Sequence, residues 1–331
     1  ANTFTWSPAA TLSSSLGAVV TATPSGNTSY IVSGTNTVTG CSSSSNIVVI
    51  VNTSPTFSFA TATPSTLCAG LSSTLNALAT HTNYNMTAIT YSVLPTVGAT
   101  TLCNNGSVVT PLTSGTLDDG GWANIALPFS FNFYGVATTS VGISSNGFVY
   151  MNSGTPATWT GYYNALPSTA ASNPAFGVVY GDLNFSNANT KIEYFTTGTT
   201  PNQKFVINFY GTYYSNSGTL TAQAILYETT NVLEVHTGTT TVINDLVQGI
   251  QNAGATSALT VPGRNSEIFT IASPDAYRFA PITVNYGWSP VSYLTATNVS
   301  NPIANTVTSS IVYTVTANAS NGCSANNTVS L

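Results

Sequence analysis

The sequence predicts an all-β protein made of antiparallel β-sandwiches. From residue 125 to residue 133 every second position is apolar, which is the period of a strand with one buried face. Further runs rich in β-branched and aromatic residues lie at 205–210, 220–227, 232–236 and 311–316. Clusters of Gly, Asn and Pro separate these runs, and no stretch of ten residues has the 3.6-residue apolar period of a helix. Strands are therefore expected along most of the chain.

The composition excludes several classes of protein. A chain of 331 residues is long enough for two or three domains. Only 4% of the residues are charged, whereas ordinary soluble domains have about 25%. Four Lys and Arg residues and a net charge of −5 exclude the clustered cations that nucleic-acid binding needs. No apolar run approaches the roughly 18–20 residues of a membrane-spanning helix, so we expect no membrane insertion.

The charges are also unevenly distributed. All of them lie between Asp118 and Arg278, so that residues 1–117 and 279–331 carry none. A neutral exterior of Ser, Thr and Asn is typical of extracellular modules, because cytosolic proteins use surface charge for solubility and to protect sheet edges. Four cysteines without metal-type spacing fit an oxidising compartment. We therefore expect a secreted or cell-surface protein.

An internal repeat divides the chain into modules. Trp6-Ser-Pro recurs as Trp288-Ser-Pro, and Cys41 follows the first tryptophan at the same interval at which Cys323 follows the second. The pattern is typical of an Ig-like sandwich, in which a tryptophan packs in the core and a late-strand cysteine bridges to an early strand. The predicted modules are 1–54, a partial Ig-like module without its early strands; 55–94 with 282–331, an Ig-like module split by an insertion; and 95–281, a larger jelly-roll-like antiparallel sandwich.

The cysteines allow several disulfide pairings. The split module favours a bond between Cys68 and Cys323. A Cys68–Cys103 bond is an alternative, as is a bond from Cys41 to a cysteine before residue 1. Spacing alone does not choose among these connectivities.

The sequence shows no catalytic constellation, so we predict no catalytic residues and no enzyme. There is no Gly-x-Ser-x-Gly motif, and neither histidine, His81 or His236, lies in a nucleophile motif. Glu234 and His236 are two residues apart on a strand and could share a metal ion or a proton, or belong to the exposed face of an amphipathic strand. Glu228 and Glu234 would form a glycosidase pair only if the fold placed them opposite each other.

One turn is a candidate calcium site. Asp118 and Asp119 precede two glycines and supply hard oxygen ligands at a bend, and Asp182 or Asn184 from another loop could complete the coordination shell. The alternative is that the aspartates cap turn amides at the entry to a strand. We predict no other cofactor.

The remaining charges are expected to pair within the larger module. With so few charged residues, each is expected to have a partner. Asp275 with Arg278, and Arg264 with Glu267, are the predicted salt bridges.

Two aromatic segments are candidate ligand-binding sites. Trp159, Tyr162 and Tyr163 interrupt the strand pattern, and Tyr213 with Tyr214 forms a second such turn. Flat rings beside Asn and Thr can stack on the faces of sugars, but rings in loops also serve core packing. A glycan is therefore a candidate partner.

The chain also resembles a known family of surface proteins. The Trp-Ser-Pro, Thr-x-Tyr-x-Val and Leu-Cys-Ala-Gly motifs resemble the Ig-like/PKD-like repeats of large surface proteins in type IX-secreting Bacteroidota. The central part resembles a β-sandwich module of the same proteins in the motifs at 117–120, 127–135, 143–148, 181–184, 192–198, 224–228, 248–252 and 261–265. The resemblance implies export, a cell-surface location and an adhesive or structural role. The first repeat lacks its early half and no sorting domain is present, so we expect a segment of a longer protein.

Two functions follow as expectations. The first is an extracellular structural protein that self-associates into a filament- or sheath-like polymer. Strand complementation is a candidate route, because a sandwich without its early strands exposes unpaired backbone. The second is a surface adhesin that binds polysaccharide through the aromatic loops.

Overall fold

The chain folds into two compact units. The computed structural model describes residues 2–151, 165–169, 174–212, 218–240 and 245–331. The smaller unit combines residues 1–79 with 284–331, and the larger unit spans 80–283. These boundaries differ from the expected 94/95 and 281/282 because the strand β6 (Tyr84–Ile89) pairs with β20 (Asp275–Pro281) inside the larger unit.

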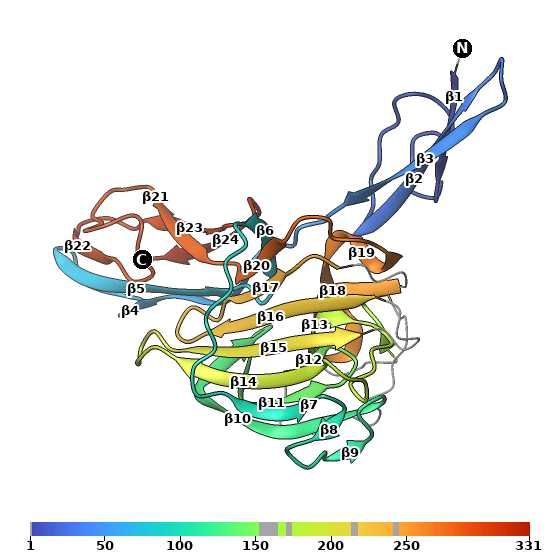
Figure 1. Cartoon of the computed structure of the whole chain (residues 1–331). Helices are drawn as coiled ribbons and strands as arrows, with labels where there is room; N and C mark the ends of the chain where they lie inside the picture. Colours follow the sequence, from blue (N-terminus) through green and yellow to red (C-terminus); the bar gives the residue numbers. More distant parts are fainter. Residues whose placement is uncertain (1, 152–164, 170–173, 213–217, 241–244) are drawn as a thin grey trace. The chain divides into compact units, whose positions relative to one another are not determined.

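The larger unit is a sandwich of two antiparallel sheets, which Figure 1 shows as stacked layers. The seven-stranded sheet has the order β19 (Ala258–Ile268), β18 (Asp245–Gln251), β13 (Ala175–Tyr180), β12 (Phe148–Tyr150), β11 (Val136–Ser144), β10 (Gly120–Phe133) and β9 (Ser114–Gly115). The eight-stranded sheet has the order β6, β20, β17 (Leu233–Thr237), β16 (Thr219–Tyr227), β15 (Lys204–Thr212), β14 (Lys191–Thr197), β7 (Thr100–Asn104) and β8 (Ser107–Val108). A short 3-10 turn, Ala253–Ala255, follows β18.

The core of this unit lies between the two sheets. In β10 the predicted alternation is confirmed, since every second residue from Ile125 to Phe133 is buried. Phe176 of one sheet and Phe279 of the other meet edge to face with ring centroids 5.9 Å apart. Each such buried side chain stabilises the fold by about 1.5–3 kcal/mol. The prediction of an all-β antiparallel sandwich is confirmed.

The smaller unit contains three three-stranded sheets. They are β1 (Asn2–Ser7), β2 (Thr28–Asn36) and β3 (Ser42–Val49); β21 (Val284–Ser289), β23 (Val312–Ala319) and β24 (Ser324–Ser330); and β22 (Ile303–Val307), β5 (Leu71–Thr80) and β4 (Thr56–Thr63). The second and third sheets enclose a core around Leu75, Trp288 and Tyr313. Strands from either side of residues 80–283 therefore share one hydrophobic core.

The structure contains neither the Cys68–Cys323 bond nor the Cys68–Cys103 bond that the sequence suggested. Cys41, Cys68, Cys103 and Cys323 are all free thiols. Cys103 lies on β7 with its side chain inside the core of the larger unit, where it packs as a small apolar residue. Burial raises the pKa of its thiol to about 12, so it is not a reactive thiolate.

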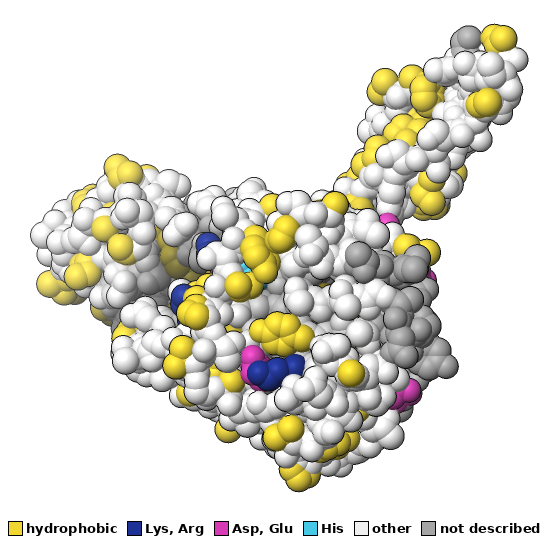
Figure 2. All heavy atoms as spheres, in the orientation of Figure 1, with side chains coloured by type: hydrophobic (Ala, Val, Ile, Leu, Met, Phe, Trp, Pro, Cys, Tyr) yellow, Lys and Arg dark blue, Asp and Glu magenta, His cyan; other side chains and the backbone are white. Residues whose placement is uncertain are grey.

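The described residues contain no helix long and apolar enough to cross a membrane. Charged side chains are sparse on the face that Figure 2 shows, and most of its surface is uncharged polar side chain and backbone.

Candidate functional site

A row of buried polar side chains crosses four strands of the eight-stranded sheet. Glu193, Asn208, Gln223 and His236 lie directly opposite one another on β14, β15, β16 and β17. Successive side chains of a strand alternate between faces, so these four lie on the face away from the main core. The Asn208 amide donates to Oε1 of Glu193 at 3.1 Å, and Gln223 Nε2 donates to Oδ1 of Asn208 at 2.9 Å. The Thr96 hydroxyl donates to Glu193 and accepts from Asn208, so the row is hydrogen-bonded from Glu193 to Gln223.

The chain segment 91–96 lies over this row and is bonded to it. Gln223 holds the backbone of Leu94 twice, accepting from its N–H at 2.7 Å and donating to its carbonyl at 3.0 Å. The N–H of Ser92 donates to Nδ1 of His236 at 3.1 Å. Buried side chains thus provide hydrogen-bond partners for the backbone N–H and C=O groups of an irregular segment that has no strand partner at these positions.

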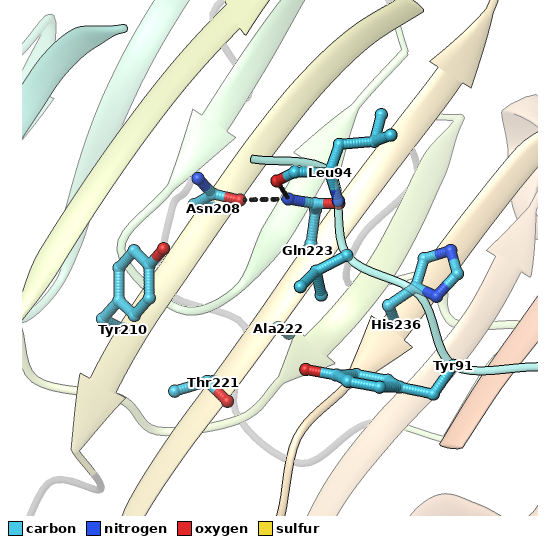
Figure 3. A pocket seen from close by; sticks show the side chains of 9 residues that line it. Tyr91, Leu94, Asn208, Tyr210, Thr221, Ala222, Gln223 and His236 are labelled. Carbon is cyan, nitrogen blue, oxygen red and sulfur yellow. Dashed lines mark hydrogen bonds between the residues drawn. The ribbon is translucent and has the colours of Figure 1, made fainter. Parts of the chain in front are cut away.

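A pocket of about 140 Å³ opens beside this segment (Figure 3). Tyr91 and Tyr210 stand at its two sides in the close-up, and Asn208, Gln223 and His236 line it between them. Ligand pockets usually measure about 300–1,000 Å³, so this one can receive one edge of a small polar molecule but cannot enclose it.

Glu234 is the centre of a buried ionic cluster on β17. Its carboxylate accepts from the Tyr227 hydroxyl at 2.6 Å, from Arg278 Nε and Nη2 at 2.7 and 2.6 Å, and from Nε2 of His236 at 3.2 Å. Burial alone would raise the pKa of Glu234, but the hydrogen bonds from His236, Tyr227 and Arg278 outweigh it and lower the pKa to about 2. The carboxylate is therefore charged at neutral pH.

The pair Glu234 and His236 does not form the exposed polar face of an amphipathic strand, because both residues are buried. They contact each other, as their spacing predicted. His236 accepts a backbone N–H at Nδ1, so its ring proton lies on Nε2 and points to Glu234. Both ring nitrogens have partners, which leaves neither free to act as a general base.

The predicted salt bridges have different partners in the structure. Arg264 pairs with Asp275, at 3.1 Å between Nη1 and Oδ1, and Arg278 pairs with Glu234. Arg278 lies directly opposite Glu234 in the β17–β20 register, so cross-strand geometry rather than sequence proximity decides the pairing. The predictions of Asp275–Arg278 and Arg264–Glu267 were wrong.

The candidate calcium turn lies between β9 and β10. The hydroxyl of Thr116, rather than an aspartate side chain, accepts the N–H groups of Asp118 and Asp119 at 3.3 and 3.1 Å. Burial and the nearby charges of Asp119 and Asp182 raise the pKa of Asp118. The three carboxylates are thus near enough to repel one another. However, within the part of the chain that the structure describes, no group of three or more His, Cys, Asp or Glu side chains could hold a metal ion. Asn184, the other candidate ligand, accepts from the backbone N–H of Ser186 at 2.8 Å.

The aromatic candidates lie outside the described residues. This applies to Trp159, Tyr162, Tyr163, Tyr213 and Tyr214. Sequence reasoning missed the polar row. Its signal was present, since Asn208 and Gln223 interrupt otherwise apolar strands, but nothing in the sequence indicated that residues 91–96 would cover them.

Replacing Gln223 by Leu tests the role of the row. We expect a loss of about 2 kcal/mol in the free energy of unfolding, because the Leu94 backbone and the Asn208 amide lose buried partners. Hydrogen exchange should increase at residues 91–97. Thr221→Val, an exposed position on the same strand, is the matched control and should change neither quantity. Unchanged exchange in Gln223→Leu would contradict this role.

Comparison with known proteins gives one assignment. No curated protein and no solved structure matches the chain. The family described as NIDO related matches residues 83–283, which correspond closely to the larger unit at 80–283. Because this match covers more than half of the sequence, the chain belongs to the NIDO-related family.

Proposed function

We propose that the chain is an extracellular structural protein that self-associates into a filament- or sheath-like assembly at a cell surface. Both units consist of antiparallel β-sheets, the architecture that suits a structural module. The resemblance of its motifs to the Ig-like/PKD-like surface repeats of type IX-secreting Bacteroidota supports an exported protein.

One observation carries the proposal: the smaller unit has no charged side chain yet exposes many large apolar ones. Residues 1–79 and 284–331 contain no Lys, Arg, Asp or Glu. Val19 and Val38 are 89% and 84% exposed. The other exposed large apolar side chains of this unit are Leu16, Ile31, Ile47, Val48, Ile50, Phe59, Leu71, Leu78, Val291, Val299, Ile303 and Val312. Uncharged surfaces with this much exposed apolar side chain favour association with other polypeptides.

The test is the assembly state of the full chain. By light scattering after gel filtration and by electron microscopy, we expect polymers that grow with concentration. Introducing charge with Val19→Glu and Val38→Glu should shift the chain towards monomer, because like charges would then meet in the contacts. The matched control, Val97→Glu with Val136→Glu on the larger unit, should leave assembly unchanged. A monomer at all concentrations would overturn the proposal.

A second candidate, a polysaccharide-binding adhesin, is favoured by the pocket between Tyr91 and Tyr210. Two tyrosine rings beside amide side chains suit the edge of a sugar. A monomeric chain that binds polysaccharide, and loses that binding in Tyr210→Ala, would favour this function over the structural one.

A further inference from the structure

The two copies of the Trp-Ser-Pro repeat fold into equivalent sheets. The strands β1 and β2 place Trp6 opposite Val32, and β21 and β23 place Trp288 opposite Val315. In each copy the indole N–H donates to the carbonyl eleven residues further along the chain, at 2.9 and 2.8 Å. The two sheets can therefore be compared position by position.

In the second copy, the apolar face of the sheet is covered by another sheet of the same chain. Trp288, Tyr313 and Val329 are buried against Leu75 and Ala77 of β5. The strand β5 is also hydrogen-bonded to the edge formed by residues 300–302 and β22. There, the N–H groups of Gly70, Leu75 and Ala77 donate to the carbonyls of Val307, Pro302 and Ser300.

In the first copy, Tyr30 is buried as Tyr313 is, but the rest of the corresponding face is more open. Ile47 lies opposite Tyr30 as Val329 lies opposite Tyr313, but Ile47 is 44% exposed and Val329 only 5%. A groove of about 480 Å³ lies on part of this face, where Phe4 and Val32 line it together with Asn and Ser residues of β1, β2 and β3. Among the described residues, no hydrophobic core cluster includes any residue of 2–54.

The edge that would bind a further strand is also open in the first copy. The bridge between Leu12 and Ala22 matches the bridge between Leu294 and Ala304, so residues 18–25 correspond to residues 300–307. The carbonyls that correspond to the three acceptors of β5 are those of Ala18, Val20 and Ser25. None of these three accepts a backbone hydrogen bond within the described part of the chain.

The chemistry of the missing occupant follows from the second copy. The occupant there is the β4–β5 hairpin, which is uncharged and buries alternate residues of β5 such as Leu75 and Ala77. The first copy is itself free of charge, so it offers no group that would attract a charged partner.

We propose that the open face of the first copy, with its edge at residues 18–25, is an acceptor site for an uncharged β-hairpin of the β4–β5 type that a neighbouring polypeptide chain supplies. The hairpin adds antiparallel to the 18–25 edge and covers Trp6, Val32 and Ile47. This inference rests on the proposed structural function, and it names the chemistry of the contact that joins one chain of the assembly to the next.

The experiment uses the full chain and a synthetic peptide of residues 55–80. The peptide carries a fluorophore for anisotropy measurements and a photo-crosslinker at the position of Leu75. We expect one peptide to bind per chain and the cross-links to map to residues 2–49. A peptide with Leu75→Lys and Ala77→Lys should not bind, because its charges would be buried in an apolar face.

Two neighbouring positions supply the matched variants. Val32→Lys places a charge on the open face and should weaken binding by about 100-fold, since an unpaired buried charge costs several kcal/mol. Ile31→Lys lies on the opposite face of the same strand, where the side chain is 48% exposed, and should leave the affinity within about twofold. Hydrogen-exchange protection of residues 28–36 reports whether the sheet stays folded in both variants.

Several outcomes would overturn the acceptor site: no binding of the peptide, cross-links confined to residues 284–331, equal weakening by both lysine variants, or a dimer of two open faces that excludes the peptide. The two proposals fail separately. A chain that assembles but does not bind the peptide overturns only the acceptor site, whereas a chain that binds the peptide and stays monomeric overturns only the proposed function.

Discussion

Replacing Glu234 by Gln should lower the free energy of unfolding of the larger unit by about 3 kcal/mol. The substitution keeps the shape of the side chain but removes the charge that Arg278, His236 and Tyr227 all contact. Removing one partner of a buried ion pair costs roughly 3–5 kcal/mol. We expect the lower end of this range because the Arg278 side chain is 47% exposed and can turn to water.

Urea unfolding at neutral pH measures this effect. Glu267→Gln makes the same chemical change on β19 at a partly exposed position, and should alter stability by less than about 0.5 kcal/mol. If the two variants lose the same stability, the carboxylate of Glu234 has no special role in the fold.

The larger unit should also lose stability as the pH falls from about 4.5 towards 2. The pKa of Glu234 is lowered from 4.5 to about 2 in the folded state, so the folded protein binds its proton less tightly than the unfolded chain does. The stabilisation is complete above the unfolded pKa and is lost as the pH falls through the folded one. The pKa difference corresponds to about 3 kcal/mol. The pKa of Glu193 is lowered as well, which acts in the same direction, although burial alone would raise it; the hydrogen bonds from Lys191 and Asn208 lower it.

Unfolding curves recorded between pH 6 and pH 2.5 check this prediction. In Glu234→Gln the loss of stability on acidification should be smaller, because the titrating group is absent. Asp118, whose pKa is raised in the fold, acts in the opposite direction and remains in both proteins. An equally steep loss in the variant would show that other carboxylates cause the acid sensitivity.

The parts of this fold that depend on local pattern could be predicted from the sequence. The alternation of apolar residues in β10 predicted both the strand and its buried face, because the apolar side chains of a strand lie on the face that packs against the core. The repeat of Trp6 and Trp288 likewise indicated two related sheets, and these have the same register.

The parts that depend on distant segments could not be predicted. Glu234 and His236 look like an exposed polar face because the sequence does not show that residues 91–96 cover that side of the sheet. The partner of Arg278 was missed for a related reason: the register between β17 and β20 sets it, and no local spacing encodes that register. For the cysteines, the repeat suggested a bond that the folded chain does not form.

The way the chain enters and leaves the larger unit has a mechanical consequence. Tyr84 on the incoming strand lies opposite Pro281 on the outgoing one, and the N–H of Ile282 donates to the carbonyl of Asn83 at 3.0 Å. The entry and exit points are therefore neighbours. Tension along the backbone from residue 79 to residue 284 would first act on these few hydrogen bonds, where the chain enters and leaves the larger unit. As long as these bonds hold, such tension would not be transmitted to the rest of the large sandwich.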